Sequence, residues 1–206
     1  MDGRFVGRIV AEKRTRGSGR ADRLARWTAR LFAPPVLPVA AGCVLSLRAA
    51  QPVWGIVAVG GSVLAVVVMV VGARRGWWSD AELSRRAERP LPLACASGGA
   101  LVVWLVCWRL GAPGTLLVPA ALAPLGGAAF LVCTRWGKIS LHTSAAAGGL
   151  ALLGLQVSPW WAVAGGPLVW LIGWSRVRLR AHSVRQVWAG GLLGAGLTAL
   201  VLWLAG

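Results

Sequence analysis

The fold is decided by the stretch Ser175-Arg176-Val177-Arg178-Leu179-Arg180-Ala181-His182-Ser183-Val184-Arg185-Gln186. It separates two apolar runs, residues 159–175 and 184–205, and it holds one of only two histidines in the chain. Apolar runs of this kind are typical of membrane helices, because a hydrocarbon core about 30 Å thick needs about 20 helical residues. We therefore expect a polar loop between two membrane segments, with an imidazole where the second segment begins.

The composition of the whole chain also favours a membrane protein. Of its 206 residues, 57% are hydrophobic and 14% are charged, and the mean hydropathy is +0.68, which argues against an ordinary soluble domain. The 22 Lys and Arg residues far outnumber the 6 Asp and Glu residues, but they are confined to short strips between apolar runs. We therefore expect anionic membrane lipids and phosphate groups as partners, and no nucleic acid.

The apolar runs predict an all-α, polytopic transmembrane bundle of about six to seven segments. Five runs precede the two given above, at residues 32–49, 53–73, 92–110, 115–134 and 141–157. The first run contains three prolines, which permit only a broken or half-inserted helix. The runs at 141–157 and 159–175 are short, so we expect them to form a tight hairpin in the interior of the bundle. Gly190 and Gly194 predict a close helix contact.

The first residues form a basic segment ahead of the membrane domain. We divide the chain into this segment, residues 1–30, and a transmembrane domain of residues 31–206. Leu24, Trp27 and Leu31 recur at helical spacing with arginines between them, which predicts an amphipathic helix on an anionic membrane surface. Residues 1–30 contain no apolar core followed by a cleavage site, so no cleaved signal peptide is expected.

The distribution of basic residues predicts how the chain lies in the membrane. If seven segments cross, Arg48 and Arg109 are the only bases of the chain on one side. The excess of bases on the other side places the N-terminus and three polar loops in the cytoplasm of a multi-pass protein of the cell membrane. The four cysteines all lie within apolar runs without ligand-like spacing, so neither a disulfide nor a metal site is expected.

The three polar loops carry the residues capable of chemistry. They lie near residues 74–91, 135–142 and 175–183, and pairs of segments separate them, so all three can meet at one membrane face. They contain both histidines, His142 and His182, together with Arg, Lys and Ser. Each histidine lies near a predicted helix start, where free N–H groups favour an anion, so this pattern indicates chemistry on a phosphate.

The motifs in these loops resemble the three signatures of the type 2 phosphatidic acid phosphatase (lipid phosphate phosphatase) superfamily. The first signature is Lys, six residues, then Arg-Pro; Arg89-Pro90 matches its end, and Glu82 stands at the position of its Lys. The second signature is Pro-Ser-Gly-His. Ser140 and His142 match its Ser and His, whereas its Pro and Gly are replaced.

The third signature gives the most specific match. It reads Ser-Arg, five residues, His, three residues, Asp. Ser175-Arg176 and His182 match it at the right spacing, and Gln186 replaces the Asp. The order and spacing of the three motifs agree with the superfamily over roughly residues 74–200.

The resemblance implies a hydrolase for phosphoric monoesters or diphosphates, acting on a lipid or isoprenoid substrate without a metal or other cofactor. His182 would attack phosphorus to give a phosphohistidine. His142 would protonate the leaving oxygen and then activate water. Arg89, Arg176 and Ser140 would hold the phosphoryl oxygens, a task that guanidinium groups perform bidentately.

Further roles follow from the residues that depart from the signatures. Gln186 would orient His182 if the last helix starts by about residue 180, because the two side chains then lie one turn apart. Lys138 would add a phosphate contact. Arg85 or Arg86 would supply the charge that the first signature has lost.

A second hypothesis remains open. The departures at Glu82, Leu141 and Gln186 equally fit a noncatalytic membrane protein of the same fold that binds a lipid phosphate or scaffolds a partner. Each histidine alone also fits an ordinary interfacial residue, and Gln186 fits packing between helices. The arginines that remain in the third loop fit headgroup anchors. The sequence leaves a homo-oligomer open.

Overall fold

The structure is a computed structural model that describes residues 19–80, 82–83 and 85–205. The first 18 residues, which belong to the predicted basic segment, lie outside the described residues. The described chain is all-helical and contains no strand. Its elements are α2 (Arg20–Leu31), α3 (Val36–Arg48), α4 (Pro52–Arg74), the 3₁₀ helix η1 (Arg86–Glu88), α5 (Pro90–Arg109), α6 (Gly114–Ala120), α7 (Leu122–Cys133), α8 (Leu141–Gln156), α9 (Trp160–Arg178) and α10 (Val184–Ala205).

The helices lie close to the predicted apolar runs, with one division that the prediction lacks. The run at 115–134 is split at Ala121 into α6 and α7. Pro119 and Pro124 flank this break, and proline lacks the N–H group that continues a helix. The break therefore follows from two missing backbone donors within six residues of sequence.

Among the described residues, four helical stretches are long and apolar enough to cross a membrane. They are α4, η1 with α5, α6 with α7, and α10. The pair α2 and α3 passes the same test together, with a bend of 44° between them. These stretches indicate a multi-pass membrane protein.

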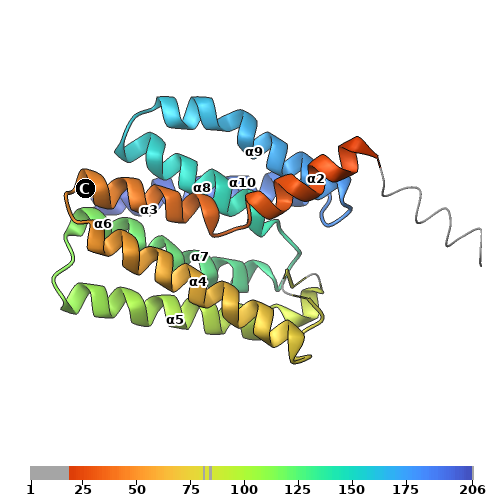
Figure 1. Cartoon of the computed structure of the whole chain (residues 1–206), viewed down its shortest axis with the longest axis horizontal. Helices are drawn as coiled ribbons and strands as arrows, with labels where there is room; N and C mark the ends of the chain where they lie inside the picture. Colours follow the sequence, from red (N-terminus) through yellow and green to blue (C-terminus); the bar gives the residue numbers. More distant parts are fainter. Residues whose placement is uncertain (1–18, 81, 84, 206) are drawn as a thin grey trace, which may run out of the picture.

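Helix α8 forms the centre of the bundle. It packs against α10, α9 and α3, and it has more buried residues than its neighbours (Figure 1). Helix α9, its partner in the hairpin, lies on the outside and exposes Trp160, Trp161 and Trp170. The predicted interior hairpin is therefore correct for α8 and wrong for α9, because large aromatic side chains along α9 face outward.

The contact between α8 and α10 depends on two glycines, as predicted. A Cβ atom at Gly190 would collide with the carbonyl oxygen of Ser140, and one at Gly194 would collide with the carbonyl oxygen of Ser144. Small residues at this spacing let two helix backbones approach closely. The approach fixes the first turns of α8, where His142 lies, against the first half of α10.

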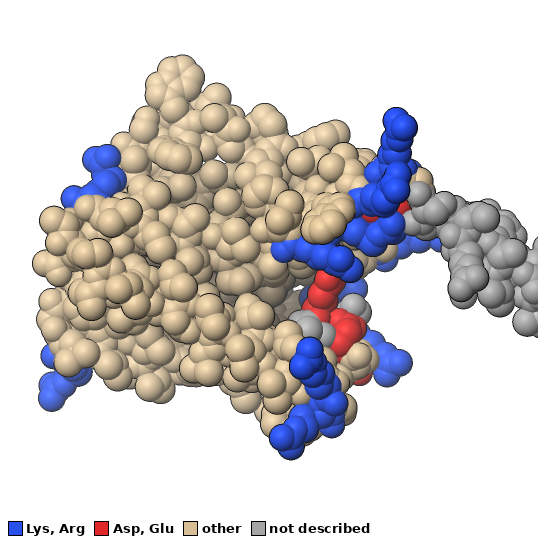
Figure 2. Space-filling model, in the orientation of Figure 1, with Lys and Arg blue, Asp and Glu red and all other residues tan. Residues whose placement is uncertain are grey.

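The polar loops gather at one end of the bundle. Successive helices run back and forth, so the segments before α5, before α8 and before α10 all lie at the end where α2 is found (Figure 1). Figure 2 shows most of the Lys and Arg side chains of this face at that end, around a hollow in which acidic side chains lie.

Helix α2 is attached to this end by one face only. Ala25 and Ala29 are buried, α2 packs against α9, and Asp22 Oδ1 accepts a hydrogen bond from Arg178 Nε at 2.7 Å. The apolar side chains on its other side, among them Trp27, are exposed. A short helix therefore presents an apolar stripe outward beside the polar loops.

Candidate functional site

Hydrogen bonds to backbone carbonyls join the three loops. Arg89 is buried at the start of α5; its Nε donates to Leu83 O at 2.9 Å and its Nη1 donates to Ile139 O at 3.3 Å. Lys138 Nζ donates to Ala181 O at 2.9 Å. The first loop is thus tied to the second, and the second to the third, as the even spacing of the segments predicts.

Residues in the first turns of α8 and α10 add hydrogen bonds between the second and third loops. Ser140 is fully buried, and its Oγ caps α8 by accepting from the backbone nitrogen of Thr143 at 3.4 Å. The backbone nitrogen of Ser140 donates to Gln186 O at 3.1 Å, and Thr143 Oγ1 donates to Val187 O at 3.0 Å. Thr143 is a bridging residue that the sequence analysis missed, although a hydroxyl in the first turn of an apolar helix is a usable signal.

Arg176 is the most deeply buried charge of the third loop. Its side chain is 4% exposed, and its Nη2 donates to Glu82 Oε2 at 2.6 Å. Its Nε is buried and has no hydrogen-bond partner among the described residues. A buried N–H without a partner is costly, and an oxyanion placed beside it would remove that cost.

Glu82 is held as a carboxylate by this contact. Burial on its own would raise the pKa of Glu82, but the hydrogen bond and the charge of Arg176 outweigh it and lower the pKa below its ordinary value. In the first signature, Glu82 stands at the position of the Lys, and this position does not indicate a partner for it. Its pairing with Arg176 spans 94 residues of sequence and has no local signal.

His182 is oriented by the first residues of α10. Its Nδ1 lies 3.1 Å from Gln186 Oε1, and that oxygen also accepts from the backbone nitrogen of Ser183 at 3.2 Å. The backbone nitrogen of Gln186 donates in return to Ser183 Oγ at 3.3 Å. These reciprocal bonds form a capping box, in which Ser183 precedes the helix and Gln186 is its third residue.

The route by which Gln186 reaches His182 differs from the prediction. We predicted this contact on the condition that the helix starts by about residue 180, which would place both side chains on one helical face. Helix α10 begins at Val184, and Arg180 has a φ of 54° in the turn before it. His182 therefore lies outside the helix, and the capping box brings its partner to it.

The contacts of His182 define its tautomer and its charge. A backbone N–H only donates, so the Gln186 atom facing Ser183 is an oxygen, and His182 Nδ1 must carry a proton to bond to it. Burial lowers the pKa of His182 to about 4, with the nearby charge of Lys138 as the next cause. At neutral pH the imidazole is thus uncharged, with a lone pair on Nε2.

His142 lies in the first turn of α8 and is buried. The backbone of Ala29 in α2 lies close to its ring, and the charged groups that act on it are those of Arg176 and Glu82. The second loop, the third loop and the helix ahead of the membrane domain therefore meet around this imidazole. Ala29 could not be found from the sequence, because a main-chain contact leaves no trace in a motif.

The two other arginines proposed for the first loop have contacts of their own. Arg86 Nε donates to Thr134 O at 2.6 Å, and its Nη2 donates to Arg135 O, so Arg86 closes the C-terminal end of α7. Arg85 is exposed and lies 3.5 Å from Glu88 Oε1.

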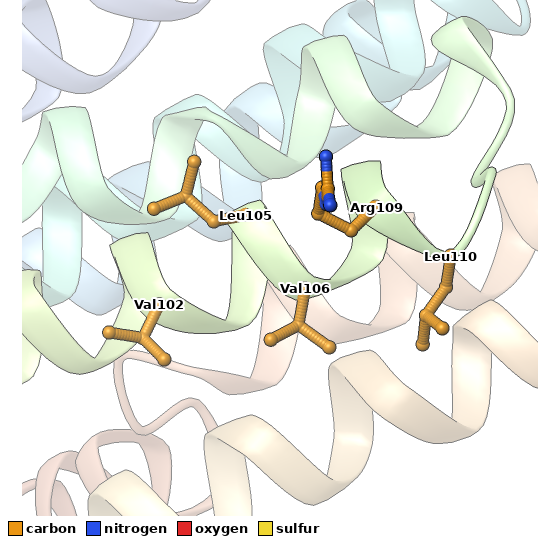
Figure 3. Close-up of a pocket in the computed structure, with 5 residues that line it drawn as sticks. All are labelled: Val102, Leu105, Val106, Arg109 and Leu110. Carbon is orange, nitrogen blue, oxygen red and sulfur yellow. The ribbon is translucent and has the colours of Figure 1, made fainter.

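The apolar surface of the bundle carries shallow grooves that are separate from this cluster. Figure 3 shows one on α5, lined by Val102, Leu105, Val106, Arg109 and Leu110. It lies at the end of α5 away from Arg89, and its lining is apolar apart from one arginine. In the described part of the chain, no group of three or more His, Cys, Asp or Glu side chains is arranged to hold a metal ion.

The polar loops thus bring together two imidazoles, two buried guanidinium groups and an ammonium group. This arrangement can bind an oxyanion and can hold a neutral nitrogen nucleophile beside it. Comparison with protein-family models, with curated proteins and with solved structures finds no match to this chain.

Proposed function

We propose that this chain is an integral-membrane phosphatase that hydrolyses a lipid or isoprenoid phosphate or diphosphate, as its resemblance to the lipid phosphate phosphatase superfamily implies. The observation that carries the proposal is the buried Nε of Arg176, which lacks a partner among the described residues, in the same cluster as an uncharged His182. An oxyanion would satisfy the guanidinium group, and His182 Nε2 has the lone pair that attack on phosphorus requires.

In the proposed reaction, His182 Nε2 forms a bond to phosphorus as the bond between phosphorus and the leaving oxygen breaks. His142 gives that oxygen a proton. His142 then takes a proton from water, whose oxygen attacks the phosphohistidine; the N–P bond breaks and inorganic phosphate leaves. Arg176 and Arg89 hold the phosphoryl oxygens throughout, and Gln186 keeps His182 in one tautomer.

The proposal includes a position for the protein in the membrane. In this proposal about six to seven segments cross, and the polar loops face the cytoplasm, as the distribution of bases favours. Helix α2 lies on the anionic surface, because Leu24, Trp27 and Leu31 are all more than half exposed and arginines stand between them. A substrate with an apolar tail would then present its phosphate at the level of the loops.

Phosphate release tests this function directly. The purified chain in detergent should release inorganic phosphate from a prenyl diphosphate or from phosphatidate. His182→Ala should abolish the release, whereas Arg109→Ala, at the other end of α5, should leave it intact. Release that is unchanged in His182→Ala would disprove the assignment.

A second candidate is a noncatalytic protein that binds a lipid phosphate or scaffolds a partner. Two observations favour it: Glu82 already occupies Arg176, and an amide rather than a carboxylate orients His182. A labelled substrate separates the two candidates. The phosphatase should give an acid-labile phosphoenzyme that is lost in His182→Ala, whereas the binding protein should bind the lipid and form no phosphoenzyme.

A further inference from the structure

The carboxylate of Glu82 already forms an ion pair with Arg176, the buried arginine of the proposed phosphate site. Arg176 is 4% exposed, whereas the side chain of Glu82 is 54% exposed, and they meet at 2.6 Å. Arg176 is fixed at the end of α9 beneath the loops. Glu82 approaches it from the solvent side, in a loop that Arg89 anchors through the backbone of Leu83. The Glu82 side chain can therefore turn away into water without disturbing that anchor.

A carboxylate in this position satisfies the guanidinium group only in part. Glu82 contacts Nη2, while Nε of the same guanidinium is buried without a partner among the described residues. A phosphoryl group aligned with the guanidinium can accept from two neighbouring N–H groups at once, in two parallel N–H···O bonds. Exchange of the carboxylate for a phosphoryl group would thus satisfy Nε and return Glu82 to water.

The location of the loops gives such an exchange a purpose. The anionic groups most abundant at a membrane surface are the phosphodiesters of bulk lipids, at very high local concentration. An open arginine pocket at that depth would fill with them. A resident carboxylate makes every anion displace it first, so weak ligands stay out and strong ones still enter.

We propose that Glu82 is a resident competitor for phosphate at Arg176, which every anion must displace before it can bind there. This inference rests on the proposed phosphate site. Because Glu82 must leave for any anion, it weakens the binding of all anions by one common factor. A carboxylate that stayed in place would instead repel a dianion more strongly than a monoanion.

Anion binding to the purified full chain in uncharged detergent tests the inference. The probes are inorganic phosphate, a dianion at about pH 8, and dimethyl phosphate, a monoanion, with binding measured by calorimetry. Glu82→Gln and Glu82→Ala remove the competitor. Glu88→Gln is the matched control, because Glu88 lies in the same loop and bonds to Ser79 and Arg85. Arg176→Gln removes the site.

Both Glu82 variants should bind both probes more tightly than the unaltered chain by the same factor, up to about fivefold for a contact of this exposure. Glu88→Gln should bind as the unaltered chain does, and Arg176→Gln should bind neither probe.

Two results would overturn the inference while leaving the proposed function standing: unchanged binding in both Glu82 variants, or a larger gain for phosphate than for dimethyl phosphate. If no variant binds phosphate, the site itself is wrong, and the proposed function fails with the inference. Tighter binding in the Glu82 variants without any turnover would keep the inference and reject the phosphatase.

Discussion

Gln186 Oε1 lies 3.1 Å from His182 Nδ1 and 3.2 Å from the backbone nitrogen of Ser183. One amide oxygen thereby holds the imidazole and helps to begin helix α10. A side chain that caps a helix is held in place by that helix. His182 is therefore held rigidly through Gln186, although His182 itself lies outside α10.

Replacement of Gln186 should change the turnover of the proposed phosphatase in two directions. Gln186→Leu removes the acceptor for His182 Nδ1, and kcat should fall on the order of tenfold to a hundredfold, as loss of a positioning contact does. Gln186→Glu supplies a charge that stabilises the imidazole as it becomes positive, so kcat should rise. Steady-state kinetics measures both, with Arg185→Gln as control. Full turnover in Gln186→Leu would refute the orienting role.

The pH dependence of turnover should reflect the burial of His182. Its pKa is lowered to about 4 from the ordinary value of 6.5, and only the neutral form can attack phosphorus. Protonation of this group should therefore leave the rate unaffected at neutral pH, and the rate should fall as the pH drops through about 4. Lys138→Met removes a neighbouring positive charge, which should move the acid limb to higher pH. An acid limb near the ordinary histidine pKa would contradict this environment.

The glycines of α10 should respond differently to the same small substitution. Gly194→Ala places a Cβ against the Ser144 carbonyl and should destabilise the fold by about 1–3 kcal/mol, the usual cost of overpacking. Gly191→Ala meets no described atom within 4 Å and should be neutral or stabilising by up to about 1 kcal/mol, because alanine favours a helix. Unfolding in a graded detergent mixture measures both, and equal effects would exclude the close contact.

The ion pair between α2 and α9 should hold α2 in place. Asp22→Asn removes a partly exposed pair with Arg178, a contact worth up to about 1 kcal/mol. Amide hydrogen exchange in α2 should accelerate by up to about fivefold. Arg178→Gln should have the same effect, and the double variant should be no worse than either single one. Additive effects would show that the two residues act independently.

Membrane orientation can be tested with an introduced cysteine. A Cβ at Gly137 meets no described atom within 4 Å, and this residue lies in the second polar loop. In a background without the four native cysteines, Gly137→Cys should react with an impermeant maleimide only in permeabilised cells. Gln51→Cys, at the opposite end of the bundle, should react in intact cells. The reverse pattern would place the loops outside.

The helices could be predicted closely because the nearby residues determine where each helix begins and ends. Apolar runs ended by Arg, Gly or Pro gave bounds near those of α4, α5 and α10. The convergence of the loops was also predictable, since it depends only on an even number of segments between them. The break at Ala121 could have been found from its two flanking prolines.

The details of the site could not be predicted in the same way. The contact of Glu82 with Arg176 joins residues that no sequence period relates. The capping box that joins Gln186 to His182 depends on the turn before α10, which the apolar pattern does not define. The ring of His142 lies close to the main chain of Ala29, whose position follows from packing alone.

The loops are joined largely through main-chain oxygens, those of Ile139, Ala181 and Thr134. Every amino acid supplies such an oxygen, so these positions can accept many substitutions while the geometry persists. Motif recognition reads side chains and is blind to carbonyl groups. A lineage built in this way can therefore drift beyond recognition in its sequence long before its architecture changes.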